Sequence, residues 1–200
     1  MNSRPALAAA LSLALWNLTA TAAEPQSVQP GQDFSNPLFK MKSPNSAGWT
    51  GLIQNASRIA FARSGASAVD SDVAAVMLFA VPKSISDEDF LALAKKGVEE
   101  DAPKPRFDVE AASMELSHDR PYTCVKYSAT SIDHGNKGFF IPKRSLRLQM
   151  VSLYCQYPNR PGLGFAISFS HRGVTPMPAF QQEAEDFIAG VQVAQPDKKP

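Results

Sequence analysis

The sequence contains few of the residues that usually bind metals or act as catalytic nucleophiles. It has two cysteines and three histidines among 200 residues, and none of these has another within five positions. Zinc sites normally use closely spaced pairs such as C-x₂-C or H-x₃-H. The G-x-S-x-G pattern of many serine hydrolases is missing as well. The sequence therefore predicts no metal site, no cofactor and no catalytic residue.

Long apolar stretches are missing after the N-terminus, and the one at the N-terminus is short. Arg4 is followed by an apolar run over 6–18 and then by small residues, an order typical of a secretory signal peptide. The run is shorter than the ~20 residues that a membrane-spanning helix needs. We therefore expect a signal peptide over residues 1–22, cleaved after Ala22 or alternatively after Ala23. The mature chain should have no integral membrane span and should be periplasmic or secreted.

An excess of charge of one sign is missing too. The chain has 20 Lys and Arg residues against 19 Asp and Glu residues, and the expected signal peptide removes only Arg4 from this balance. A neutral protein lacks the broad positive field that attracts nucleic acid. The sequence therefore predicts that nucleic acid is not a partner.

The mature chain divides into three parts by composition. Residues 23–46 are rich in Pro, Gln, Ser and Asn without sustained periodicity, which predicts an extended N-terminal arm whose few apolar side chains dock on the body. Residues 194–200 are polar and contain proline, which predicts a disordered tail. The length between these parts suits a single α+β domain over residues 47–193.

Several segments of this domain show the patterns of β-strands. Residues 72–82 form an uninterrupted apolar run, which predicts a strand buried on both faces. Further strands, in antiparallel pairs, are predicted at 48–53, 58–63, 106–117, 122–132, 145–157 and 165–172. Together these segments predict an antiparallel sheet of about six or seven strands.

Two segments show helical periodicity. Ser86 is a suitable N-cap for a helix over 87–101, whose acidic first turn complements the helix dipole and which Pro103 terminates. A second, amphipathic helix is expected near the C-terminus. Its apolar stripe consists of Phe180, Ala184, Phe187, Ile188 and Val191. A sheet is the only large apolar surface available, so we expect the two helices to flank it.

The two cysteines, Cys124 and Cys155, each lie in a predicted strand. In an oxidising compartment such a pair persists as a disulfide, which we expect here; two free thiols and a metal site are the alternatives. Directly opposed residues of neighbouring strands share a face. Cys124 has the parity of the polar Lys126, whereas Cys155 has that of the apolar Leu153. The disulfide therefore requires either a β-bulge near residues 150–151 or a sheet that is covered on both faces.

Ser117, His118 and Asp119 contain the side chains of a catalytic triad in consecutive positions. Consecutive side chains point in different directions, whereas a triad is defined by its geometry in space. We therefore interpret this segment as the turn between two strands.

Four residues form the candidate binding surface. Trp49 stands at the start of a strand, and Phe139 and Phe140 lie in a loop that contains glycine. Loop aromatics either pack under their loop or are exposed to a partner. His171 extends the apolar face of the alternating strand 165–172 at its end, where we expect a hydrogen-bonded residue at the rim.

The order of elements resembles the PsbP-like α/β/α sandwich. The segments that carry the resemblance are Gly48–Trp49, the apolar strand 76–82 with the helix start 86–96, and the closing helix 184–191. This fold occurs in extrinsic photosystem subunits, a Ran-binding import factor and bacterial DcrB-like envelope proteins. The resemblance implies a binding or assembly module, with no shared catalytic residues to transfer.

These observations predict an exported, non-catalytic binding or assembly protein of the bacterial cell envelope, with an envelope protein as its partner. The alternative is a small secreted hydrolase with a Ser/His/Asp site assembled in space. Transport of a metal or a small ligand is a third reading of the same features.

Overall fold

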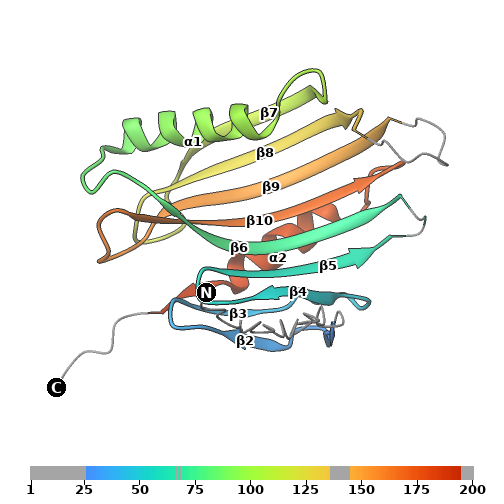
Figure 1. Cartoon of the computed structure of the whole chain (residues 1–200), viewed down its shortest axis with the longest axis horizontal. Helices are drawn as coiled ribbons and strands as arrows, with labels where there is room; N and C mark the ends of the chain where they lie inside the picture. Colours follow the sequence, from blue (N-terminus) through green and yellow to red (C-terminus); the bar gives the residue numbers. More distant parts are fainter. Residues whose placement is uncertain (1–25, 66, 68, 136–144, 195–200) are drawn as a thin grey trace, which may run out of the picture.

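The computed structural model describes residues 26–65, 67, 69–135 and 145–194 of the 200-residue chain (Figure 1). The predicted signal peptide, the loop aromatics Phe139 and Phe140, and all but the first residue of the predicted tail lie outside the described residues.

An eight-stranded antiparallel sheet forms the body of the molecule. From one edge to the other, its strands are β1 (Gln26–Ser27), β4 (Thr50–Gln54), β5 (Arg58–Ser64), β6 (Ser71–Ala80), β10 (Leu163–Gly173), β9 (Leu146–Gln156), β8 (Cys124–Asp133) and β7 (Phe107–Ser117). A separate three-stranded sheet contains β2 (Asp33–Ser35), β3 (Phe39–Lys42) and β11 (Gln192–Val193). The predicted α+β class with a large antiparallel sheet is confirmed, but the structure has more strands than predicted. Strands of two to four residues are too short for their periodicity to be seen in the sequence.

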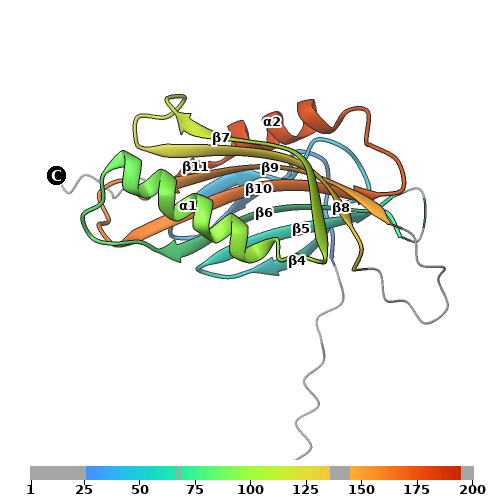
Figure 2. The ribbon, with the colours of Figure 1, turned by 90° about the horizontal axis from the view of Figure 1, so that it is seen from above.

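Helices α1 (Asp87–Asp101) and α2 (Phe180–Gly190) lie on opposite faces of the eight-stranded sheet (Figure 2). The Ser86 hydroxyl accepts a hydrogen bond from the Asp89 amide at 3.1 Å, which caps the start of α1 as predicted. On α2, the buried residues are Phe180, Ala184 and Phe187, three members of the predicted apolar stripe. Both predicted helices are confirmed.

Residues 26–46, predicted as an extended arm, form short strands against the rest of the chain. β1 pairs with β4 at the edge of the large sheet, and β2 pairs with β3. In β3, Phe39 and Met41 are buried while Lys40 and Lys42 are exposed, the alternation of a half-buried strand. The C-terminal strand β11 pairs with β3, so part of the N-terminal segment meets the C-terminal strand in the small sheet.

The two faces of the large sheet are buried to different extents. The face under α2 holds the larger core, which the small sheet also joins through Phe39 and Met41. The face under α1 has a smaller core around Phe90, Ala94 and Val125. Figure 1 shows why: α1 lies over the β7–β8 side and leaves the strands beyond it without a helix on that face.

This uneven cover corrects the expectation for residues 72–82. Met77 of β6 lies on the α1-facing side, in the same row as Tyr154 and Val125, and its side chain is 38% exposed. The strand is therefore buried on the α2 side and partly open on the other, because α1 does not extend across β6.

The register of β8 and β9 decides how the cysteines meet. Cys124 is directly opposite Cys155, and the pairing continues without a shift to Asp133 and Leu146. The β-bulge expected near residues 150–151 is therefore wrong. The other expectation holds, because α1 and α2 both cover this part of the sheet. The register shifts of the large sheet lie elsewhere, between Gly51 and Ile53 and between Val109 and Ala111.

Candidate functional site

The disulfide joins Cys124 to Cys155, and both residues are fully buried. The Gln156 amide donates to the Thr123 carbonyl beside them, so the two cysteines occupy a non-hydrogen-bonded pair, where opposed side chains are closest. The predicted disulfide is thus present in the structure. Because Cys124 is the first residue of β8, the disulfide fixes the turn that precedes this strand.

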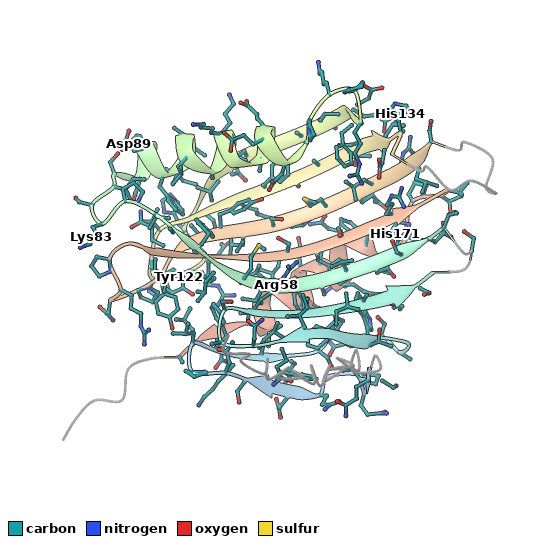
Figure 3. The ribbon with its side chains drawn as sticks, viewed as in Figure 1. Arg58, Lys83, Asp89, Tyr122, His134 and His171 are labelled. Carbon is teal, nitrogen blue, oxygen red and sulfur yellow. A yellow bond between two sulfur atoms is a disulfide. The ribbon has the colours of Figure 1, made fainter. Side chains whose placement is uncertain are left out.

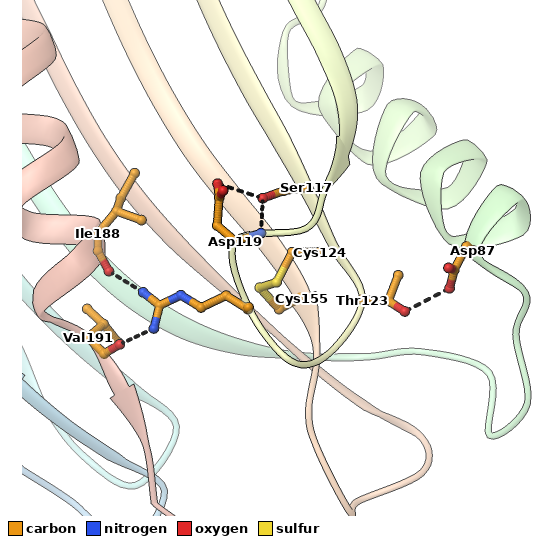
Figure 4. Close-up of a disulfide and its surroundings, with 9 residues drawn as sticks. Asp87, Ser117, Asp119, Thr123, Cys124, Cys155, Ile188 and Val191 are labelled. Atoms are coloured by element: carbon orange, nitrogen blue, oxygen red, sulfur yellow. Dashed lines mark hydrogen bonds between the residues drawn. A yellow bond between two sulfur atoms is a disulfide. The ribbon is translucent and has the colours of Figure 1, made fainter.

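That turn contacts both helices (Figure 4). The Thr123 hydroxyl donates to Asp87 Oδ1 at 2.7 Å, at the start of α1. The Arg120 guanidinium donates to the carbonyls of Ile188 and Val191, at 2.7 and 3.0 Å, at the end of α2. Carbonyls at a helix C-terminus lack intrahelical partners, so the arginine satisfies groups that would otherwise need water. One end of each helix is therefore held at the same end of the sheet.

The consecutive Ser117, His118 and Asp119 form part of this turn, as predicted. The Ser117 hydroxyl donates to Asp119 Oδ2 at 2.9 Å, whereas the exposed His118 takes no part in this hydrogen bond. The hydrogen bond is local and gives the segment no triad geometry.

Trp49 of the candidate binding surface is part of the core. Its side chain is 1% exposed and its ring lies 5.7 Å from that of Phe169. Its Nε1 donates to Ser46 Oγ at 3.0 Å, and the Arg63 guanidinium stacks over the ring at 4.8 Å. Trp49 is therefore part of the larger core, where a partner has no access to it.

His171 is also largely buried and belongs to a polar cluster at the opposite end of the sheet (Figure 3). Its Nδ1 lies 2.7 Å from Asp72 Oδ1 and its Nε2 lies 3.0 Å from the Thr175 carbonyl. An oxygen acceptor thus lies within hydrogen-bond distance of each ring nitrogen, which ties the imidazole to β6 and to the turn after β10.

Arg63 connects this cluster to α2. Its Nε donates to Asp72 Oδ2 at 2.7 Å, and its Nη2 lies 3.3 Å from Glu183 Oε2. Asp72 and Glu183 thus both pair with Arg63, and Asp72 also contacts His171 in one connected set of polar contacts. We interpret the cluster as a structural one, whose polar contacts hold β5, β6, β10 and α2 together.

A different Ser/His/Asp chain forms where β7, β8 and β9 come together. His134 Nε2 lies 2.7 Å from Asp108 Oδ2, and His134 Nδ1 lies 3.2 Å from Ser145 Oγ. With the ring hydrogen on Nε2, the imidazole donates to the carboxylate and accepts from the hydroxyl, as a triad requires. The site is open to solvent, since the His134 and Asp108 side chains are 40% and 66% exposed. None of the cavities described below includes these residues.

A large hollow lies beside α1. Phe90 and Ala94 anchor the N-terminal half of this helix, while Val98 and Ala102 near its end line cavities. One cavity of ≈ 700 Å³ lies between α1 and β7, and a second of ≈ 190 Å³ extends across β8, β9 and β10. Both are lined by Val98, Ala102 and Tyr127, and we call them together the α1 cleft.

Apolar side chains and neutral hydroxyls line the α1 cleft. Its walls include Leu91, Val109, Met114, Leu148, Met150, Phe107 and Met77. Burial raises the pKa of Tyr127 and of Tyr154, so both phenols are uncharged at neutral pH. The charges on the α1 rim are balanced, with Lys95 and Lys104 against Glu99 and Asp101. The cleft is therefore suited to an apolar ligand and offers a few polar contacts.

The comparisons with known proteins identify no family for this chain. No family model and no curated protein matches the chain. A crystal structure from Bacteroides thetaiotaomicron VPI-5482 is similar with a TM-score of 0.47 and 14% sequence identity, over 86% of this chain. The chain spans about half the length of that protein, 52% of it. A likeness at this level supports no conclusion about function.

Sequence reasoning missed both the α1 cleft and the Ser145 chain. Asp108, His134 and Ser145 stand at the ends of three consecutive predicted strands, and antiparallel order brings those ends to one edge. That signal was available in the sequence. The sequence gives no such signal for the α1 cleft, because the depth of the cleft depends on the distance between α1 and the sheet.

Proposed function

We propose that the chain is an exported, non-catalytic binding protein of the bacterial cell envelope that takes an apolar ligand into the α1 cleft. The observation that carries this proposal is the hollow of ≈ 700 Å³ under the C-terminal half of α1, with its apolar walls. Small-molecule sites are typically clefts of roughly 300–1,000 Å³, lined mainly by apolar side chains with a few polar groups. The cleft has this size and this composition.

Compartment and family belong to the same proposal. The buried disulfide supports an oxidising compartment. Neither helix in the described part of the chain has the length and apolarity to cross a membrane. A large antiparallel sheet with a helix on each face supports a PsbP-like assignment. Members of that fold serve mainly as binding or assembly modules, so we propose an envelope protein as the partner that exchanges the ligand.

Binding of the neutral fluorophore N-phenyl-1-naphthylamine tests the cleft. Ala112 is exposed on β7 and lines the larger cavity, so Ala112→Trp fills the hollow without disturbing the core. We expect the purified mature protein to enhance the fluorescence and Ala112→Trp to weaken binding by about tenfold or more.

Ala111→Trp is the matched control for this experiment. Ala111 is the neighbouring exposed residue of β7 and lies outside the larger cavity. The Ala111→Trp variant should bind the fluorophore as tightly as the native protein does. Equal binding by both variants, or no binding by the native protein, would refute the proposed function.

A second candidate function, a small secreted hydrolase, is favoured by the Asp108–His134–Ser145 chain alone. In that function the Ser145 hydroxyl attacks an ester carbonyl carbon and passes its proton to His134 Nδ1, which then protonates the departing alcohol. Water releases the acyl group by the same route. A fluorophosphonate, which phosphonylates an activated serine and loses fluoride, should label the native protein and not Ser145→Ala. Ser117→Ala should stay labelled, and an unlabelled native protein would exclude this function.

A further inference from the structure

A row of side chains leads from the α1 cleft across the open part of the sheet. The register makes Tyr154 of β9, Ala166 of β10, Met77 of β6 and Arg58 of β5 successive neighbours. The first three line the cleft, and Arg58 is the next residue on the same face. Neighbouring strands are ~4.8 Å apart, so Arg58 lies about 14 Å from Tyr154 across the strands. The row thus joins an apolar hollow to a single cation.

Arg58 has no anionic partner among the residues that the structure describes. None of the ion pairs in that part of the chain includes it. Its side chain is half-buried, and its Nε is buried without a hydrogen-bond acceptor. Buried donors in native proteins are nearly always paired with protein, water or a bound group. An acceptor from outside the chain therefore suits this position.

The charge pattern indicates the kind of acceptor. Lys95 and Lys104 on the α1 rim are offset by Glu99 and Asp101, so that rim has no net preference for an anion. Arg58 carries the unbalanced positive charge at the far end of the row, and an arginine fork matches a carboxylate in geometry. Charge complementarity thus places a carboxylate at Arg58, and the apolar cleft places a hydrocarbon chain at the other end.

We propose that the α1 cleft binds a free medium- or long-chain carboxylate, with its carboxylate on Arg58 and its hydrocarbon chain directed along the row toward α1. This inference rests on the proposed function and adds the class of ligand. The chain would enter between Val98 and Tyr127, pass over Ala166 and Met77, and end at the guanidinium (labelled in Figure 3). Ala166 leaves room for it because its side chain is a single methyl group.

Competition against N-phenyl-1-naphthylamine on the mature protein tests the proposal, with decanoate and 1-decanol as competitors of equal chain length. Decanoate should displace the fluorophore at about tenfold lower concentration than decanol, because only the carboxylate pairs with Arg58. Arg58→Gln should reduce this preference to less than about twofold by weakening decanoate and leaving decanol unchanged.

Arg147→Gln is the matched control. Arg147 also has a buried Nε without a partner, but its Nη2 pairs with Glu110 and it lies on the other face of the sheet. This variant should keep the preference for decanoate. Equal displacement by decanoate and decanol on the native protein, or a preference that survives Arg58→Gln, would overturn the inference and leave the proposed function standing. Failure of the fluorophore to bind would instead refute both.

Discussion

Asp133 receives two arginines at the end of β8. Arg172 Nε donates to its Oδ2 at 2.7 Å, and Arg106 Nε donates to its Oδ1 at 3.2 Å. Burial of the carboxylate opposes its ionisation, but the hydrogen bonds from Arg106, the Gly135 amide and Arg172 outweigh burial and lower the pKa of Asp133. The ionised form is therefore favoured by folding.

This shift gives a pH dependence with a definite sign. Because the pKa of Asp133 is lower in the folded protein, its contribution is full above the unfolded value of about 4 and is lost as the pH falls further. We expect Asp133→Asn to lower the free energy of unfolding by about 2 kcal/mol at neutral pH, since it leaves two arginines without their partner. Urea titrations across the pH range measure this difference.

The difference between native protein and Asp133→Asn should shrink steadily below about pH 4. Asp119→Asn, in an exposed turn, serves as the comparison. A constant difference between native protein and Asp133→Asn from pH 7 down to acid would contradict the assignment.

Single residues differ in how much of their role the sequence reveals. Ser86 and Pro103 mark the two ends of α1 because capping and termination are local. The cluster of Arg63, Asp72 and His171 was not foreseen, because its members come from three strands and meet only through the register. Trp49 was assigned to the surface because its neighbours in sequence gave no periodicity, whereas its neighbours in space decide its burial.

Among the elements, β8 and β9 are joined by the disulfide as well as by their ladder. The cysteines are 31 positions apart, and closing a loop of this length stabilises the folded state by roughly 3–4 kcal/mol in the chain-entropy model. We expect Cys124→Ala/Cys155→Ala to lower the unfolding midpoint in urea accordingly. Because both sulfurs are buried, dithiothreitol should reduce the native protein only on unfolding.

Dithiothreitol added throughout the urea titration should move the native midpoint to that of the double variant and leave the variant unchanged. Rapid reduction of the folded native protein, without loss of structure, would show that this end of the sheet opens readily.

At the scale of the whole molecule, the N-terminal segment belongs to the core. Phe39 is fully buried, with its ring 5.6 Å from that of Phe165 and 6.1 Å from that of Tyr157. Phe39→Ala should therefore lower the free energy of unfolding by about 3–5 kcal/mol, as expected for a large cavity in a core. Thermal or urea unfolding measures the effect.

Lys40→Ala, at the exposed neighbouring position of β3, should change stability by less than about 0.5 kcal/mol. A small effect of Phe39→Ala would show that residues 26–46 fold separately from the body. The fold class can be predicted from the composition and from the hydrophobic periodicity of the longer segments. The packing of residues 26–46 against the body cannot, because a strand of four residues is too short to show a clear periodicity.

The described contacts of α1 with the rest of the protein are concentrated near the N-terminal end of the helix. Asp87 is bonded to Thr123 and Phe90 is packed below, while the C-terminal turns extend over the cleft. We therefore expect the helix to move most at Val98 and Ala102, which line the cleft. Amide hydrogens from Gly97 onward should accordingly exchange with deuterium sooner than those near Ala94, and a ligand seated under the helix should slow them.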